Sequence, residues 1–246
     1  MIHVPPVAEV KDYAILRAFR AAFEGRRFSH RDPRLSERMA SQFFEDLAHF
    51  VASEKLRARM SAHTRAANLG TKTAGENSRR ADGVFGEPAA DCAAQSLAGF
   101  LVARGETSTI EIGVETKLLT KSLTKRIDRV IGDLVRQAGQ FKSTGGNPIT
   151  VGIVGVNFAP QYTSYERDRE YPTDGKDNKH PIQEAVQAES RVASRAASAF
   201  DEFQFLRFRA SNVAPYPFEW VDFAQTAKEY GALLVRISRL YDRRFP

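Results

Sequence analysis

Five segments of the chain place apolar residues at the three- and four-residue spacing of an amphipathic helix. They are residues 8–24, 35–60, 121–142, 181–200 and 219–244. Gly25 ends the first segment, Gly145 and Gly146 stop the third, and Pro181 suits the first turn of the fourth. The pattern therefore predicts helices at both ends of the chain and one long helix near its centre.

Shorter runs between these helices have the composition of β-strands. They begin at Asp82-Gly-Val-Phe-Gly and continue at Leu97–Ala103, Thr107–Leu119, 149–157 and Phe203–Arg209. Residues 61–81 are polar and are expected to form a loop, and residues 87–96 a short helix or a loop. Within 107–119, Glu111, Gly113, Glu115 and Lys117 alternate with apolar residues, so they are expected to share one face of a strand.

The order of elements in the centre of the chain predicts a βαβ unit. The run 149–157 is continuously apolar and rich in β-branched residues, as in a strand that is buried on both faces. It follows the strand 107–119 and the helix 121–142, an order that favours a right-handed crossover in a mixed sheet.

The chain has no internal repeat and no evident linker, so we expect a single α/β domain over 1–246 with a central mixed β-sheet flanked by helices. Its parts are an N-terminal helical layer over 1–60, a core over 76–157, a polar insertion over 158–180, and C-terminal helices and a strand over 181–246.

Composition excludes several classes of protein. Of 246 residues, 42% are hydrophobic and 27% charged, which excludes a disordered chain and a collagen-like repeat. Cys92 is the only cysteine, so an internal disulfide or a thiolate zinc site is excluded. The longest apolar stretches are too short to span a bilayer, and the N-terminus lacks the pattern of a secretory signal. We therefore expect a cytoplasmic protein.

The charge balance favours an anionic partner. Lys and Arg number 36 against 30 Asp and Glu, a net charge of +6, and 26 of the basic residues are Arg. Arginine binds phosphate with a forked geometry, so this composition fits a nucleic-acid partner. Biased codon usage is the alternative explanation for the excess of arginine.

Carboxylates are the candidate catalytic groups. The sequence contains no GxSxG elbow, Walker A loop or HExxH helix, and its five histidines lack metal-ligand spacing. Glu115 and Lys117 lie two residues apart on one face of a strand that is otherwise apolar. Charged side chains are costly at the rim of a hydrophobic core, so a functional role is a reasonable explanation for Glu115 and Lys117. Two similar tripeptides, at 174–176 and 177–179, lie in the polar insertion, where solvated charges are expected.

Asp82, Glu115-Thr116-Lys117, the following helix and the buried strand 149–157 together resemble the PD-(D/E)xK nuclease superfamily. The resemblance covers roughly residues 54–157. It implies a restriction-endonuclease-like core over 76–157 and Mg²⁺-dependent hydrolysis of phosphodiester bonds. Mg²⁺ prefers hard oxygen ligands and can both neutralise phosphate charge and generate hydroxide.

The resemblance also implies roles for individual residues. Asp82 and Glu115 would hold Mg²⁺ together with the backbone carbonyl of Thr116, and Lys117 would orient the attacking water and offset charge in the transition state. Asp91 is the alternative to Asp82. Accessory candidates are Glu54 or Glu76 from a preceding helix or loop, for which an exposed carboxylate is the alternative. Gln137 and Gln140, from the helix after the motif, are further candidates, for which an ordinary polar helix position is the alternative.

Basic residues around this motif are candidate nucleic-acid contacts. They are Arg79 and Arg80 before Asp82, and Lys121, Lys125 and Arg126 at the start of the following helix, where the alternative is a solvated surface. The insertion 158–180 interleaves tyrosines with bases, which suits nucleic-acid contact. It also carries nearly as many acids, so a flap or a dimer contact is an equal alternative.

These observations favour a Mg²⁺-dependent DNA endonuclease, of the type II restriction kind or a related defence nuclease. Cleavage of both strands of duplex DNA with one site per chain implies a homodimer. One alternative is a module of the same fold that binds nucleic acid without cutting it, with Glu115 and Lys117 as a structural ion pair. Another is a metabolic or structural α/β protein.

Overall fold

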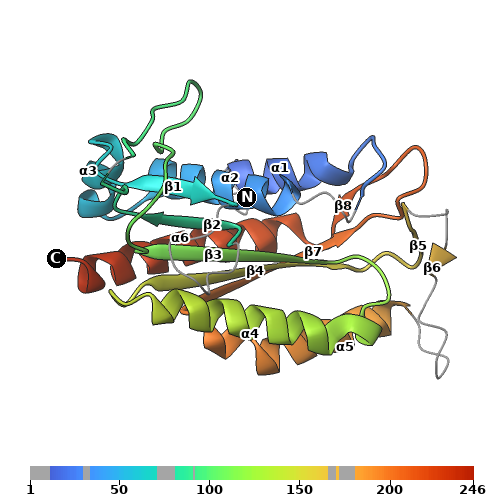
Figure 1. Ribbon diagram of the computed structural model, residues 1–246. Helices are drawn as coiled ribbons and strands as arrows, with labels where there is room; N and C mark the ends of the chain where they lie inside the picture. Colours follow the sequence, from blue (N-terminus) through green and yellow to red (C-terminus); the bar gives the residue numbers. More distant parts are fainter. Residues whose placement is uncertain (1–11, 30–33, 71–80, 91, 166–169, 172–180) are drawn as a thin grey trace, which may run out of the picture.

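The computed structural model describes residues 12–29, 34–70, 81–90, 92–165, 170–171 and 181–246 (Figure 1). Its centre is a mixed six-stranded sheet in the order β1-β2-β3-β4-β7-β8. The strands are β1 (Ala66–Leu69), β2 (Gly83–Gly86), β3 (Ile112–Leu119), β4 (Ile149–Asn157), β7 (Glu202–Arg209) and β8 (Glu219–Trp220). The α/β class predicted from the sequence, with a mixed sheet between helices, is confirmed.

The central three strands run parallel, and the outer strands antiparallel. β3 pairs with β4 from Ile112 opposite Ile149 to Leu119 opposite Val156, and β4 pairs in parallel with β7. Every residue of β4 is buried, as its continuous apolar run predicts. The helix that connects β3 to β4 is α4 (Ile127–Ser143), which follows the short 3-10 helix η1 (Thr124–Arg126). The βαβ unit is therefore confirmed.

Helices cover both faces of the sheet (Figure 1). One face packs against α1 (Ala14–Phe23), α2 (Arg34–Phe50), α3 (Glu54–Ser61) and α6 (Phe223–Arg244) in a core that includes Phe19, Phe44, Val114, Ile153 and Tyr230. The opposite face packs against α4 and α5 (Pro181–Arg195), with Leu119, Val154 and Val156 in contact with Leu134, Ala188 and Val192. β3 is thus enclosed by α2 on one side and α4 on the other.

Several element boundaries differ from the sequence-based expectation. The long helix predicted over 35–60 is broken at Val51–Ser53, because the Ser53 hydroxyl caps a new helix by accepting from the Leu56 N–H at 3.0 Å. The predicted loop 61–81 contains β1, which pairs with β2. The strand predicted over Leu97–Ala103 is wrong, since that segment forms turns and bends, and the isolated bridges lie beside it at Gln95 and Arg104.

The C-terminal helix also begins later than predicted. Glu219–Trp220 form the edge strand β8 beside β7, and Asp222 then caps α6 by accepting from the Gln225 N–H at 2.9 Å. In the polar insertion, β5 (Tyr162–Thr163) and β6 (Glu170–Tyr171) form a small antiparallel pair. No helix in the described part of the chain is long and apolar enough to cross a membrane.

Candidate active site

The site lies where β2 and β3 separate. Their antiparallel pairing ends at Gly83 opposite Val114, so β3 continues past the beginning of β2 with one edge unpaired by that strand. Asp82 occupies this edge, and its Oδ2 accepts a hydrogen bond from the Thr116 N–H at 2.7 Å. The N–H and C=O of one strand residue point to the same side, so the Thr116 carbonyl faces the same edge. Asp82 and this carbonyl therefore lie on one side of β3.

Glu115 and Lys117 extend from the neighbouring positions of β3 toward α4. The Lys117 Nζ donates to Glu115 Oε1 at 2.5 Å, and the two side chains are 30% and 5% exposed respectively. Two residues earlier on the same face, Gly113 leaves room for the ring of Phe141 on α4, where a Cβ atom would come within 2.7 Å of the ring. The strand thus presents one buried carboxylate and one half-buried ammonium beneath α4.

Asp82 is close enough to Glu115 for its charge to oppose the ionisation of Glu115. Burial raises the pKa of Glu115 to about 7, and the negative charge of Asp82 adds to this rise against the attraction of Lys117. Burial also raises the pKa of Asp82, while Lys117 and the hydrogen bond from Thr116 oppose the rise. The structure therefore brings together the three residues that the sequence motif singled out.

Lys117 remains an ammonium in this setting. Burial disfavours its charge, but the carboxylates of Glu115 and Asp82 outweigh that effect and raise its pKa. A protonated lysine next to two carboxylates can donate to an oxygen of a bound anion or of water. It cannot serve as a base.

Helix α2 contributes two groups that the sequence did not single out. The Ser36 side chain hydrogen-bonds with Asp82, and the Glu37 carboxylate raises the pKa of Asp82 through its charge. One turn further, α2 packs closely on β2: a Cβ atom at Gly83 would lie 2.7 Å from the Cβ of Ala40. In the sequence, Ser36 and Glu37 precede Ala40 by about one helical turn. This spacing would have indicated that both residues lie near Asp82 only if the packing of α2 on β2 had been known.

Helix α4 contributes a further carboxylate, Asp133, whose charge acts on both Glu115 and Lys117. Gln137 is buried on the same helix, 5% exposed. α4 returns antiparallel to β3, and one helical turn of about 5.4 Å nearly matches two strand residues of about 3.3 Å each. Phe141 lies over Gly113, so Gln137, one turn earlier on α4, is expected near the level of Glu115, and its accessory role stays a prediction. Gln140, on the next turn, has a buried Oε1 atom.

Other predicted residues lie elsewhere. Glu54 begins α3, and the neighbouring Lys55 donates to the Phe245 carbonyl near the end of the chain. Among the described residues, the groups that shift the pKa of Asp82 and Glu115 come from α2, β3 and α4, and Glu54 is not among them. Glu76, Arg79, Arg80 and Asp91 lie outside the described residues.

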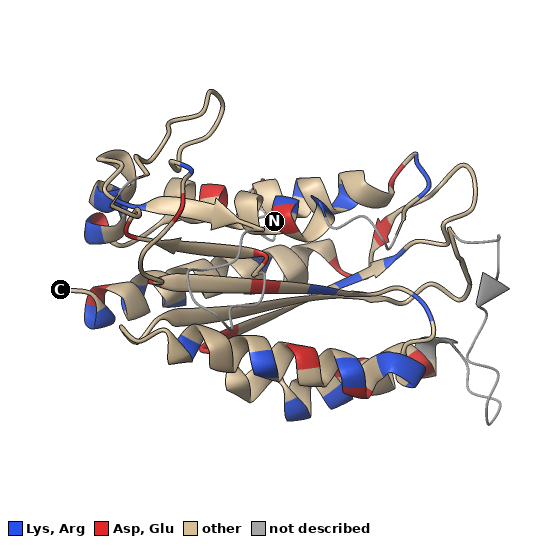
Figure 2. Ribbon diagram, viewed as in Figure 1, with Lys and Arg blue, Asp and Glu red and all other residues tan. Residues whose placement is uncertain are grey.

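The predicted basic contacts lie past the end of β3. Lys121 donates to the Ser164 hydroxyl at 2.7 Å. Lys125 and Arg126 are exposed on η1, and basic residues continue along the outer surface of α4 (Figure 2). These cations therefore face solvent at the same end of β3 as Lys117.

The donor set has the chemistry of a site for a hard divalent cation. Glu115 Oε2 is buried with no hydrogen-bond partner, and a cation would relieve the repulsion between Glu115 and Asp82. The described residues contain no cluster of three His, Cys, Asp or Glu placed to hold a metal. Mg²⁺ commonly binds through one or two carboxylates and keeps several waters, and Asp82, Glu115 and the Thr116 carbonyl are the groups of this site that could hold it.

Comparison with protein-family models, with curated proteins and with solved structures gives no match in any of the three. The geometry of Asp82, Glu115 and Lys117 is therefore what supports a function.

Proposed function

We propose that the protein is a Mg²⁺-dependent endonuclease that hydrolyses phosphodiester bonds of DNA, with a restriction-endonuclease-like core. One observation carries the proposal. Asp82 and Glu115 lie beside each other at the fork of β2 and β3, with a buried carboxylate oxygen of Glu115 left without a partner and the Lys117 ammonium adjacent. A buried acid whose pKa is raised by burial and by a neighbouring carboxylate destabilises the folded protein, and a bound cation would relieve that cost.

Each residue has a role that follows from its state in the site. Asp82, Glu115 and the Thr116 carbonyl would hold Mg²⁺, which when bound supplies Lewis-acid activation of the phosphate and lowers the pKa of its water. Lys117 orients the attacking water and stabilises the negative charge that develops on the phosphate oxygens. Glu37 and Asp133 maintain negative potential around the pair, and the Ser36 hydrogen bond holds the Asp82 carboxylate in place.

A duplex substrate and a homodimer follow from the reaction. One site per chain cuts one strand, so two chains related by a two-fold axis would cut both. A stand-alone cleaving domain with these properties suits a type II restriction enzyme or a related defence nuclease, acting in the cytoplasm.

The second candidate is a nucleic-acid-binding module without catalysis. The observation that favours it is the direct 2.5 Å contact of Lys117 with Glu115, which a purely structural ion pair would also make. Glu115→Ala separates the two candidates. In the nuclease it abolishes Mg²⁺-dependent cleavage of DNA while gel-shift affinity measured in EDTA is retained. Wild-type protein that binds duplex DNA tightly but leaves it intact with Mg²⁺ would favour the module.

A further inference from the structure

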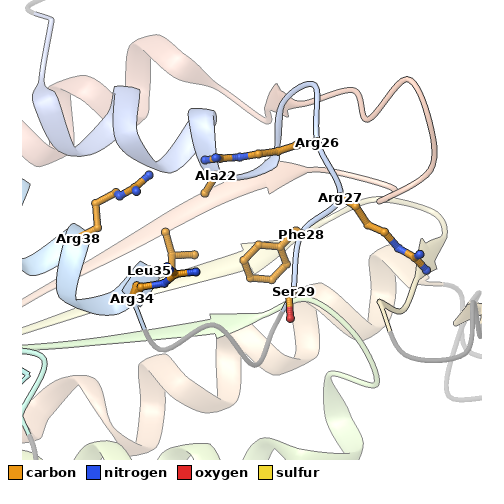
Figure 3. A pocket seen from close by; sticks show the side chains of 8 residues that line it. All are labelled: Ala22, Arg26, Arg27, Phe28, Ser29, Arg34, Leu35 and Arg38. Atoms are coloured by element: carbon orange, nitrogen blue, oxygen red, sulfur yellow. The ribbon is translucent and has the colours of Figure 1, made fainter.

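A hollow between the end of α1 and the start of α2 is lined by arginines. Its volume is about 380 Å³, and Arg26, Arg27, Arg34 and Arg38 contribute to its wall together with Ser29 (Figure 3). Among the described residues that line the hollow, none is acidic. The Arg27 side chain points away from the other three (Figure 3). The like charges of Arg26, Arg34 and Arg38 at one hollow favour an anion there. We refer to it as the arginine pocket.

The arginine pocket differs from sites in which an arginine is paired with a carboxylate, as in Arg104 with Glu45 and Arg244 with Asp201. In the described part of the chain, Arg26 and Arg38 are exposed and have no such partner. Their donors are available for a ligand, and the planar fork of arginine matches the oxygens of a phosphate group.

The loop that forms the pocket is held in place by the C-terminal half of the chain. The Phe28 N–H donates to Asn212 Oδ1 at 2.7 Å, and the Asn212 side-chain amide donates back to the Phe28 carbonyl at 3.2 Å. The Gly25 N–H donates to the Tyr216 carbonyl at 3.0 Å. Gly25 and Phe28 are thus held before any ligand binds, and a segment that is already held loses little conformational entropy on binding.

The pocket lies next to the candidate active site. The first turn of α2 carries Arg34 and Arg38 on one side and, on another, Ser36 and Glu37, which act on Asp82. The two sites are therefore separated by about the diameter of a helix, roughly 10–12 Å. The Arg27 side chain extends from the pocket toward Ser164. Its Nη2 donates to the Ser164 carbonyl at 3.4 Å, and the Ser164 hydroxyl accepts from Lys121. A path of cations thus runs from the pocket to the end of β3.

We propose that the arginine pocket binds a backbone phosphate of the nucleic acid, a few nucleotides along the strand from the phosphate that is hydrolysed. This inference rests on the proposed function, because it takes the strand through the site at Asp82 and Glu115. Successive phosphates of one strand rise about 3.4 Å along the axis of a duplex and lie further apart in space because the strand winds around that axis, so a separation of roughly 10–12 Å corresponds to about two nucleotides. The phosphate contact fixes the register of the strand and reads no base.

The test compares two double variants of the full chain in EDTA. Arg26→Ala with Arg38→Ala removes the two arginines without partners, and Arg239→Ala with Arg243→Ala removes the same charge from exposed positions of α6. Binding of a short fluorescent DNA duplex is measured by anisotropy between about 50 and 200 mM salt. Circular dichroism and the melting temperature of each variant establish that it is folded.

The pocket variant is expected to weaken binding about tenfold and to reduce the slope of log affinity against log salt by about 0.9, the value for one phosphate contact. The α6 variant is expected to keep the wild-type slope. Equal slopes for wild type and the pocket variant, or no duplex binding by wild type, would overturn the inference. Inorganic phosphate that binds the wild-type pocket without displacing DNA would also overturn it, since the pocket would then serve a free phosphate.

This outcome is separable from that of the proposed function. Cleavage with Mg²⁺ tests Asp82, Glu115 and Lys117, whereas the salt slope in EDTA tests the arginines without any turnover. A protein that binds DNA through the pocket but never cuts it would retain the phosphate contact of the pocket and refute the nuclease.

Discussion

Replacing Glu115 by Gln is expected to stabilise the metal-free protein above neutral pH. Burial and the charge of Asp82 raise the pKa of Glu115 from 4.5 to about 7 in the folded protein. Between about pH 4.5 and pH 7, the Glu115 carboxyl is deprotonated in the unfolded chain but still protonated in the folded protein. The folded state therefore becomes progressively less stable relative to the unfolded state as pH rises through this range. At 1.36 kcal/mol per pKa unit, the free energy of unfolding at about pH 8 is lower by roughly 3 kcal/mol than it would be without this shift in pKa.

Gln at this position avoids the loss while its amide oxygen can still accept the hydrogen bond from Lys117. The free energy of unfolding of Glu115→Gln should therefore be close to that of wild type at about pH 4.5 and exceed it by about 2–3 kcal/mol at about pH 8. Urea denaturation in EDTA, followed by circular dichroism across this pH range, measures the difference. Added MgCl₂ should then stabilise the wild type at pH 8 more than the variant, because a cation bound only to the folded state shifts the equilibrium.

Glu111 provides the matched control. It is buried to a similar extent on the same segment, but its carboxylate is paired with Arg65 at 2.6 Å and accepts from the Tyr241 hydroxyl. Glu111→Gln should destabilise the protein at pH 8, because it leaves the partly buried Arg65 without that charge partner. The reasoning about the site is refuted if Glu115→Gln also destabilises at pH 8 in EDTA. Glu115 would then be the ionised member of a structural pair with Lys117.

Three further predictions concern catalysis and packing. Lys117→Ala should lower the rate of DNA cleavage by at least about 100-fold, with gel-shift affinity in EDTA kept; comparable cleavage would remove Lys117 from the mechanism. Asp46→Ala should cost about 3 kcal/mol in urea denaturation, because Asp46 accepts from two N–H groups at the start of α1 and from the Tyr230 hydroxyl at 3.1 Å. A loss below about 1 kcal/mol would show that water replaces it. Gly155→Ala should cost about 1–3 kcal/mol by differential scanning calorimetry, since its Cβ atom would come within 2.9 Å of the Phe19 ring; an unchanged melting temperature would mean that the core yields.

The parts of the fold that the sequence predicted well are those with a strong single period. The apolar run of β4 admits few interpretations other than a strand buried on both faces. Helix α4 buries Ile127, Ile131, Leu134, Ala138 and Phe141 at spacings of three and four residues. The alternation around Glu115 and Lys117 correctly placed these two side chains on one face of β3. Asp82 was singled out because it opens a short apolar run upstream of the Glu115 strand, and that run, β2, pairs with β3 in the sheet.

The remaining features depend on which elements meet in three dimensions. The short edge strands β1 and β8 have too few residues for a period, and they exist because β2 and β7 offer them an edge. Glu37 and Asp133 looked like ordinary helix-surface carboxylates, and only the packing of α2 and α4 on β3 brings their charges to the site. Glu54, which the resemblance favoured, belongs to a helix that a serine cap separates from α2.

The most direct test of the nuclease assignment is incubation of plasmid and genomic DNA with the wild-type protein in Mg²⁺, in EDTA, and with the Lys117→Ala variant in Mg²⁺. The arrangement of Asp82, Glu115 and Lys117 predicts discrete fragments with wild type and Mg²⁺, and intact DNA in the other two reactions. DNA that wild-type protein binds at physiological salt but leaves intact in Mg²⁺, or cuts equally well after Lys117→Ala, would contradict it.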